Sequence, residues 1–97
     1  MSLEKQVCEL PGGQLVATGL QDLRAGHATP EAHLVSVAAT RLRLAGVSVP
    51  QALSSDPQLQ LYLALGATDV ADPYVQYNAW LRELTSFLEA LERRVAG

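Results

Sequence analysis

The pattern of apolar and polar positions predicts helices along most of the chain. Residues 3–10 place apolar side chains at positions i, i+4 and i+7, which fits one face of a helix, although a short strand also suits so brief a segment. Residues 14–25 repeat this spacing before Gly26, and glycine in that place favours a left-handed C-terminal cap. Gly19 lies inside this second segment, where it costs about 1 kcal/mol relative to alanine. A close approach of another backbone is one reason for a glycine there.

A third helix has the clearest start. Thr29 is placed to act as the N-cap and Pro30 takes the first helical position. Glu31 follows in the first turn, where the helix dipole favours a negative charge. The apolar spacing continues to Ala45, and Gly46 is the stop signal. We therefore expect one continuous helix over this stretch.

The segment 57–66 is compatible with two structures. Asp56 and Pro57 repeat the combination of N-cap and proline that opens helices. The leucines of the segment, however, alternate with other residues, and alternation is typical of a strand. We favour the helix, because Asp-Pro opens helices well and no nearby segment offers a strand partner.

The longest apolar stripe belongs to the C-terminal segment. Asp72 is placed as an N-cap, and a helix is expected from Pro73 to about residue 95. Apolar residues recur there at spacings of 3 and 4 over three repeats, which is the a/d seam of a heptad pattern. Trp80 and Phe87 occupy the neighbouring g position and widen the stripe. The seam itself consists of Tyr74, Tyr77, Leu81, Leu84, Leu88, Leu91 and Val95.

These elements predict an all-α fold with one domain over residues 1–97. We expect an irregular bundle of four to five helices organised around the long C-terminal helix. A chain of 97 residues supports one modest core, and the stripe is wider than its own chain is expected to cover. A second copy would cover the surplus, so the first functional hypothesis is a non-catalytic interaction module that forms a homodimer, with another protein as an alternative partner. The residues expected at the dimer interface are Tyr74, Trp80, Leu84, Phe87 and Leu91.

Composition and charge narrow the class of protein. With 48% hydrophobic and 18% charged residues, the chain is expected to be globular. A net charge of −3 counts against a nucleic-acid partner, and no apolar run approaches the ~20 residues of a membrane span. Cys8 is the single cysteine, so neither an internal disulfide nor a thiolate metal cluster can form. A reducing cytoplasm is the compartment that we expect.

A second functional hypothesis is a pocket protein that binds a small molecule or an anion, or an enzyme, with Arg41 at its site. Arg41 falls on the apolar arc of the expected 30–45 helix, where its guanidinium must reach solvent, pair with an acid or bind an anion. Its structural interpretation is an ion pair with Asp22, Glu31 or the last helix. Its functional interpretation is an anion contact in a cleft, near which we would expect Tyr77, Asn78 and His33.

Other polar residues suggest structural roles. Asn78, beside the seam, could cap a neighbouring helix end or fix the register of a dimer. His27 and His33 straddle a cap, and we expect each on the surface or in a capping role. The sequence has no phosphate-binding loop, nucleophile elbow or zinc-binding helix motif. We therefore assign no catalytic residue, metal or cofactor.

A third hypothesis comes from the stretch RLRLAGVSVPQAL, Arg41 to Leu53. It resembles the middle of a helix-turn-helix of the lactose-repressor type, whose turn is similar to residues 45–48. The resemblance implies a DNA-binding unit around residues 34–55, with a recognition helix that begins near Ser48. The stretch departs from that family at Leu42, at Ala52 and at Pro50. The implied recognition helix also carries no Arg or Lys to hold phosphates.

Overall fold

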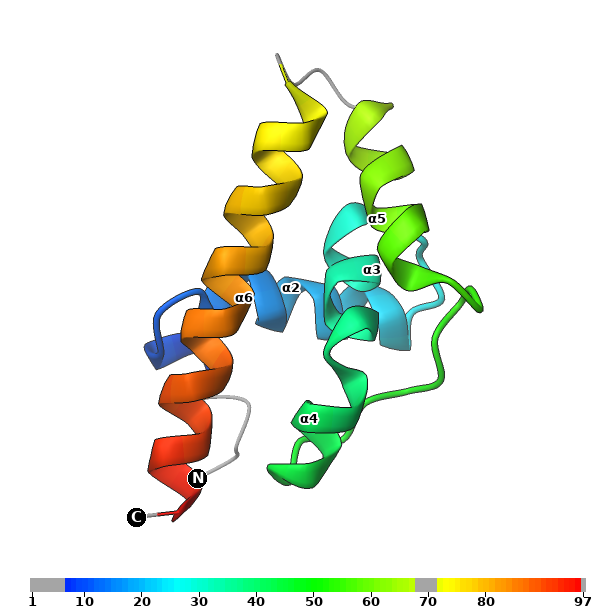
Figure 1. The fold of residues 1–97 in the computed structure, drawn as a ribbon. Coiled ribbons are helices and arrows are strands. Elements are labelled where there is room, and N and C mark those ends of the chain that lie inside the picture. Colours follow the sequence, from blue (N-terminus) through cyan, green and yellow to red (C-terminus); the bar gives the residue numbers. More distant parts are fainter. Residues whose placement is uncertain (1–6, 68–71, 97) are drawn as a thin grey trace.

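The computed structural model describes residues 7–67 and 72–96, and helices dominate both ranges. No strand occurs within these ranges, so the all-α prediction is confirmed. Residues 7–9 are helical, while the rest of the predicted 3–10 element lies outside the described residues. The helices that follow are α2 (Gly13–Arg24), α3 (Pro30–Val37), α4 (Ala39–Leu44), α5 (Pro57–Gly66) and α6 (Pro73–Ala96) (Figure 1).

Side-chain caps open three of these helices as the sequence predicts. The Thr29 hydroxyl oxygen accepts a hydrogen bond from the backbone N–H of Ala32 at 3.2 Å, at the start of α3. Asp56 Oδ1 accepts from the N–H of Leu59 at 3.2 Å, and Asp72 Oδ1 accepts from the N–H of Tyr74 at 3.1 Å. Each bond satisfies a backbone donor that has no partner inside its helix. The helical interpretation of 57–66 is thereby confirmed.

Two predicted stop signals are also confirmed. Gly26, beyond α2, has φ 76°, and Gly46, beyond α4, has φ 99°. These values lie in the left-handed region, which glycine adopts without the penalty that a Cβ brings. The long C-terminal helix is present as α6 and runs without interruption from Pro73 to Ala96.

The prediction of a single helix over residues 30–45 is wrong, because this segment divides at Ala38 into α3 and α4. Ala38 has φ −100° and ψ 12°, and its N–H bonds to the carbonyl of Val35 at 3.1 Å. Two residues earlier, the Ser36 hydroxyl donates to the Ala32 carbonyl at 2.9 Å. Such a back-bond gives a helical carbonyl a second donor and favours a bend. The break leaves α4 as a short separate helix below α3 in Figure 1.

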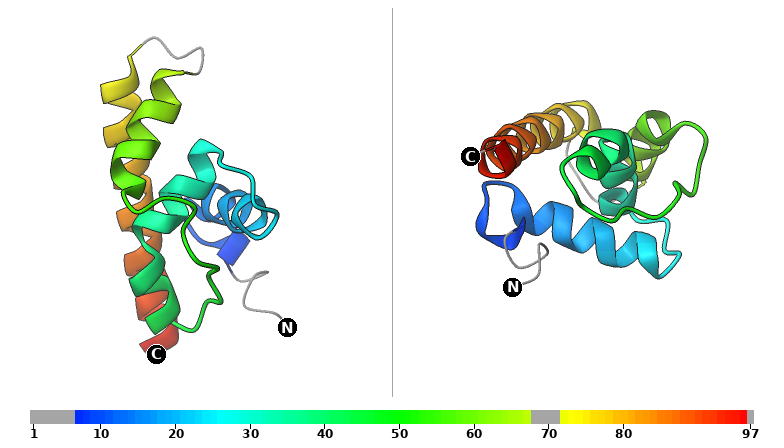
Figure 2. Two further views of the ribbon diagram at one scale, coloured as in Figure 1. Left: turned by 90° about the vertical axis from the view of Figure 1, so that its right-hand side faces the viewer. Right: turned by 90° about the horizontal axis from the view of Figure 1, so that it is seen from below.

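The helices surround one core, and α6 runs along the whole length of the molecule (Figures 1 and 2). The principal extents are 38 × 24 × 19 Å. α2 crosses the middle of the molecule, and α5 and α6 run side by side toward one end (Figure 2). The largest fully buried side chains come from all five of these helices and from residue 7: Phe87, Leu20, Leu34, Leu42, Leu61, Leu91, Val7, Val16 and Val35.

Gly19 marks the crossing of α2 and α3. A Cβ at this position would overlap the carbonyl oxygen of Glu31 and a methyl group of Val35. The two backbones approach so closely that a side chain has no room there. The close approach suggested by the sequence is therefore confirmed.

The recognition helix implied by the lactose-repressor resemblance is absent, because residues 47–56 contain no helix. The side chain of Arg43 donates to the carbonyls of Val49 at 3.1 Å and Pro50 at 3.0 Å. Arg24 donates to the carbonyl of Ser48 at 3.0 Å. These side chains take the carbonyls that a helix would use internally, and Pro50 has no N–H to give. The helix-turn-helix expected around residues 34–55 thus lacks its second helix.

Candidate functional site

The C-terminal half of α6 faces the core of its own chain. Leu84, Phe87 and Leu91, three of the five residues expected at a dimer interface, are buried. The turn before α2 lies against α6 at this level, since a Cβ on Gly12 would lie 3.5 Å from the Cβ of Phe87. These three side chains are therefore core residues of the single chain, with almost no surface left for a second copy to cover.

The N-terminal half of α6 is covered much less. The side chain of Tyr74 is 63% exposed, and Val75 beside it is also exposed. Tyr77, Trp80 and Leu81 are partly buried against the edge of the core. Of the residues expected at the interface, Tyr74 is exposed and Trp80 is partly exposed. The core therefore covers the apolar stripe only in part along the first two to three turns of α6.

Helix α5 contributes further exposed apolar side chains next to this part of α6. Leu59, Tyr62 and Leu63 are exposed, while Leu61 and Leu65 face the core. An open hollow between the two helices is lined by Asp56, Gln58, Leu59, Tyr62, Tyr74 and Tyr77. We refer to Leu59, Tyr62, Leu63, Tyr74 and Tyr77 as the tyrosine surface.

An aromatic contact joins the two helices within the tyrosine surface. The rings of Tyr62 in α5 and Tyr77 in α6 have their centroids 5.8 Å apart at an interplanar angle of 78°. This is an edge-to-face pair, an arrangement that contributes about 0.5–1.5 kcal/mol beyond the burial of area. The pair fixes the spacing of α5 and α6 where the hollow lies.

The tyrosine surface carries no formal charge. Helix α5 contains no Asp, Glu, Lys or Arg, and α6 contains none before Arg82. Asp56 and Asp72 stand just before the two helices, and each carboxylate accepts backbone N–H groups as an N-cap. The chemistry available here is therefore apolar contact and hydrogen bonding by tyrosine hydroxyls and a glutamine amide, with the Asp56 carboxylate as a negative charge in the lining of the hollow.

Arg41, the centre of the pocket hypothesis, pairs with an acid of the last helix. Its Nε donates to Glu92 Oε2 at 3.0 Å, and its Nη2 donates to Glu92 Oε1 at 2.6 Å. This hydrogen bonding raises the pKa of Arg41 and lowers the pKa of Glu92. The ion pair with the last helix is one of the structural partners that the sequence suggested. The guanidinium already has a two-point acceptor, so it is not poised for an external anion.

The other residues of the pocket hypothesis are not gathered around Arg41. Arg41, Tyr77 and Asn78 line three separate hollows. Asn78 Nδ2 donates to the carbonyl of Tyr74 at 3.0 Å, inside its own helix, instead of capping a neighbouring one. His33 is 6% exposed, so the expected surface or capping role is wrong, and burial lowers the pKa of its imidazole.

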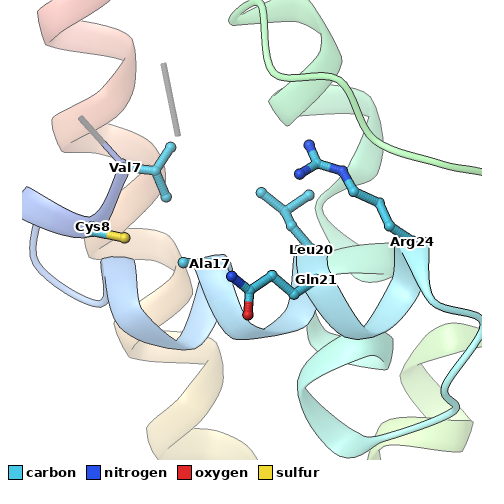
Figure 3. Close-up of a pocket in the computed structure, with 6 residues that line it drawn as sticks. All are labelled: Val7, Cys8, Ala17, Leu20, Gln21 and Arg24. Carbon is cyan, nitrogen blue, oxygen red and sulfur yellow. The ribbon is translucent and has the colours of Figure 1, made fainter. Parts of the chain in front are cut away.

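A small cavity that the sequence analysis missed lies beside α2 (Figure 3). Its volume is about 70 Å³, and its lining includes the side chains of Cys8, Gln21 and Arg24. A water molecule takes about 30 Å³ of liquid volume, so the space suits one or two waters and no cofactor. No sequence motif could have indicated it, because its lining comes from two segments that meet only in the fold.

Known proteins offer no guide to this arrangement, since no family model, curated protein or solved structure matches the chain. Within residues 7–67 and 72–96, no group of three or more His, Cys, Asp or Glu side chains could hold a metal ion. Among the helices of these same ranges, none combines the length and apolarity that a bilayer crossing requires. The candidate site is therefore defined by the tyrosine surface itself.

Proposed function

We propose that the chain is a small non-catalytic interaction module that self-associates through its C-terminal helix. The observation that carries this proposal is the exposed first part of α6, where Tyr74 continues the apolar stripe beyond the core and the neighbouring Val75 is exposed as well. Exposed apolar groups scattered singly are ordinary on protein surfaces. Here they cluster on two adjacent helices, and clustering of this kind marks interaction surfaces.

Association would add buried area to a chain of modest size. Burying a large apolar side chain contributes roughly 1.5–3 kcal/mol relative to leaving it in water. Several such side chains on the tyrosine surface are available for this gain. A single domain of 97 residues has a limited core of its own, so a partner that covers this surface would also stabilise the fold.

The pocket hypothesis receives no comparable support. The Arg41 guanidinium is occupied by Glu92, and the hollow beside that pair is lined by Leu44, Ala45, Val95 and Ala96. We further propose a cytoplasmic location, because Cys8 is an exposed free thiol and such thiols persist in reducing compartments.

Sedimentation velocity of the unmodified chain over a wide concentration series tests the proposal. We expect the weight-average mass to rise from the monomer toward the dimer as concentration increases. The melting temperature should rise in parallel, because association stabilises the folded state by mass action. A folded chain that remains monomeric at high micromolar concentration would contradict self-association.

A further inference from the structure

We propose that the open hollow between α5 and α6 binds a small quaternary ammonium cation, for which choline serves as the probe. Three tyrosines and the Asp56 carboxylate are among the residues that line this hollow. Both kinds of group attract such a cation, the rings through the negative potential of their faces and the carboxylate through its formal charge. This site goes beyond the proposed self-association and does not depend on it.

The aromatic part of the site is built around the pair of Tyr62 and Tyr77. Their ring centroids lie 5.8 Å apart and the ring planes meet at 78°, so the two rings form a corner and not a flat floor. A cation is attracted to a ring when it lies within about 6 Å of the ring centroid. The spacing of the two centroids allows one cation to meet this condition for both rings at once. Tyr74, which is 63% exposed, adds a third ring to the lining from one turn earlier in α6.

The charge of this part of the chain has a single sign, and it selects a cation. Residues 44–81 contain Asp56, Asp69 and Asp72 and no Lys, Arg, His or Glu. Asp56 lies in the lining itself, where its Oδ1 accepts a hydrogen bond from the N–H of Leu59 at 3.2 Å. A backbone N–H carries no formal charge, so this cap does not neutralise the carboxylate. A cation in the hollow therefore meets an opposite charge at its wall.

The apolar lining favours a cation whose charge is covered by methyl groups. Leu59 is 50% exposed and offers apolar contact beside the rings. A primary ammonium needs acceptors for three N–H donors, whereas a quaternary ammonium has no N–H to satisfy. Among the described residues that line the hollow, none is Lys, Arg or His, so a ligand that also carries an anionic group finds no partner for it. The site therefore suits free choline better than betaine or a phosphocholine headgroup.

Titration of the isotope-labelled chain with choline chloride tests the site. The chain is kept at a concentration at which sedimentation shows a monomer, and sodium chloride holds the ionic strength constant. We expect changes in NMR chemical shift that saturate and that centre on Tyr62, Tyr74 and Tyr77. Dimethylbutanol, the neutral isostere in which carbon replaces the nitrogen of choline, should bind at least about twofold more weakly, and so should betaine and phosphocholine. Equally tight binding of any of the three, or shift changes spread over the whole chain, would overturn the proposal.

Matched substitutions locate the site. Tyr74→Leu removes a ring but keeps an apolar side chain, and Tyr74→Phe keeps the ring. Asp56→Asn removes the charge from the lining, while asparagine caps a helix about as well as aspartate does. Asp72→Asn makes the same change at the cap of α6, outside the residues that line the hollow. Circular dichroism and thermal unfolding establish that each variant is folded.

We expect Tyr74→Leu and Asp56→Asn each to weaken choline binding about two- to fivefold, the range that an exposed cation–π contact or ion pair supplies. Tyr74→Phe should bind as the unmodified chain does, and Asp72→Asn should lose less affinity than Asp56→Asn. Unchanged affinity in Tyr74→Leu and Asp56→Asn, or equal losses in the two aspartate variants, would refute the assignment. Self-association is measured separately, by the concentration dependence of sedimentation, so either proposal can fail while the other stands.

Discussion

Arg41 of α4 and Glu92 of α6 form a two-point ion pair between residues 51 positions apart. The pair connects the helix that follows the Ala38 break to the last turns of α6. Both side chains are nearly half exposed, so water and salt screen their attraction. The pair orients α4 on α6 and is not expected to supply much of the stability.

Glu92→Gln should remove a pH-dependent contribution to the free energy of unfolding. The hydrogen bonds from Arg41 lower the pKa of Glu92 in the folded chain below its ordinary value of 4.5. The contribution is therefore complete above pH 4.5 and is lost as the pH falls through the folded-state pKa. Urea unfolding of both chains should show a small difference near neutral pH that disappears in acid and shrinks in high salt. A difference that grows in acid would contradict this assignment.

Gly19→Ala should destabilise the chain, because the new methyl group would overlap the Glu31 carbonyl and Val35. Overpacking of this kind costs about 1–3 kcal/mol, which exceeds the ~1 kcal/mol that alanine gains in a helix. Gly66→Ala is the matched control, since its new Cβ would have Pro73 Cγ as its nearest neighbour at 3.9 Å. Chemical denaturation should show a loss for the first variant and none for the second. Equal effects would mean that the α2–α3 crossing is looser than described.

Phe87→Ala and Tyr74→Ala should differ in their effect on the free energy of unfolding, because Phe87 lies in the buried half of α6 and Tyr74 in the exposed half. Phe87 is fully buried, and truncation of such a side chain costs about 3–5 kcal/mol. Tyr74 is exposed, so its truncation should change the stability of the monomer by no more than about 0.5 kcal/mol. Unfolding measured at low protein concentration distinguishes these values. A large loss for Tyr74→Ala under those conditions would show that the tyrosine packs within its own chain.

His33→Leu should reduce the loss of stability that accompanies mild acid. Burial lowers the pKa of His33 in the folded chain below its ordinary value of 6.5. Protonation is thus easier in the unfolded chain, so the stability from the neutral imidazole is complete above pH 6.5 and declines as the pH falls below it. The exposed His27 supplies the control His27→Leu. Melting temperatures between about pH 7.5 and pH 5.5 should show a flatter profile for the first variant only.

Local signals in the sequence predicted most helix boundaries, because a cap depends on residues next to each other. Thr29, Asp56 and Asp72 open helices by accepting backbone N–H groups within three residues. Gly26 and Gly46 end helices through their own backbone conformation. These features need no information about the rest of the fold.

The features that could not be predicted from the sequence depend on contacts between distant segments. Neither Ala38 nor its neighbours in the sequence are glycine or proline, so no helix-breaking residue predicts the break between α3 and α4. The burial of His33 depends on packing around α3, and a helical pattern shows which side chains share a face without showing how far that face is covered. For the same reason the heptad pattern of α6 could not separate buried Phe87 from exposed Tyr74.

The partial burial of Trp80 gives the molecule a built-in optical reporter. It is the sole tryptophan of the chain, and its indole lies one turn from Tyr77 at the margin of the core. Indole fluorescence responds to the polarity around the ring, so emission from this single chromophore would shift when water leaves its neighbourhood. Docking of two copies could thus be followed in dilute solution without a dye, a tag or any change in sequence.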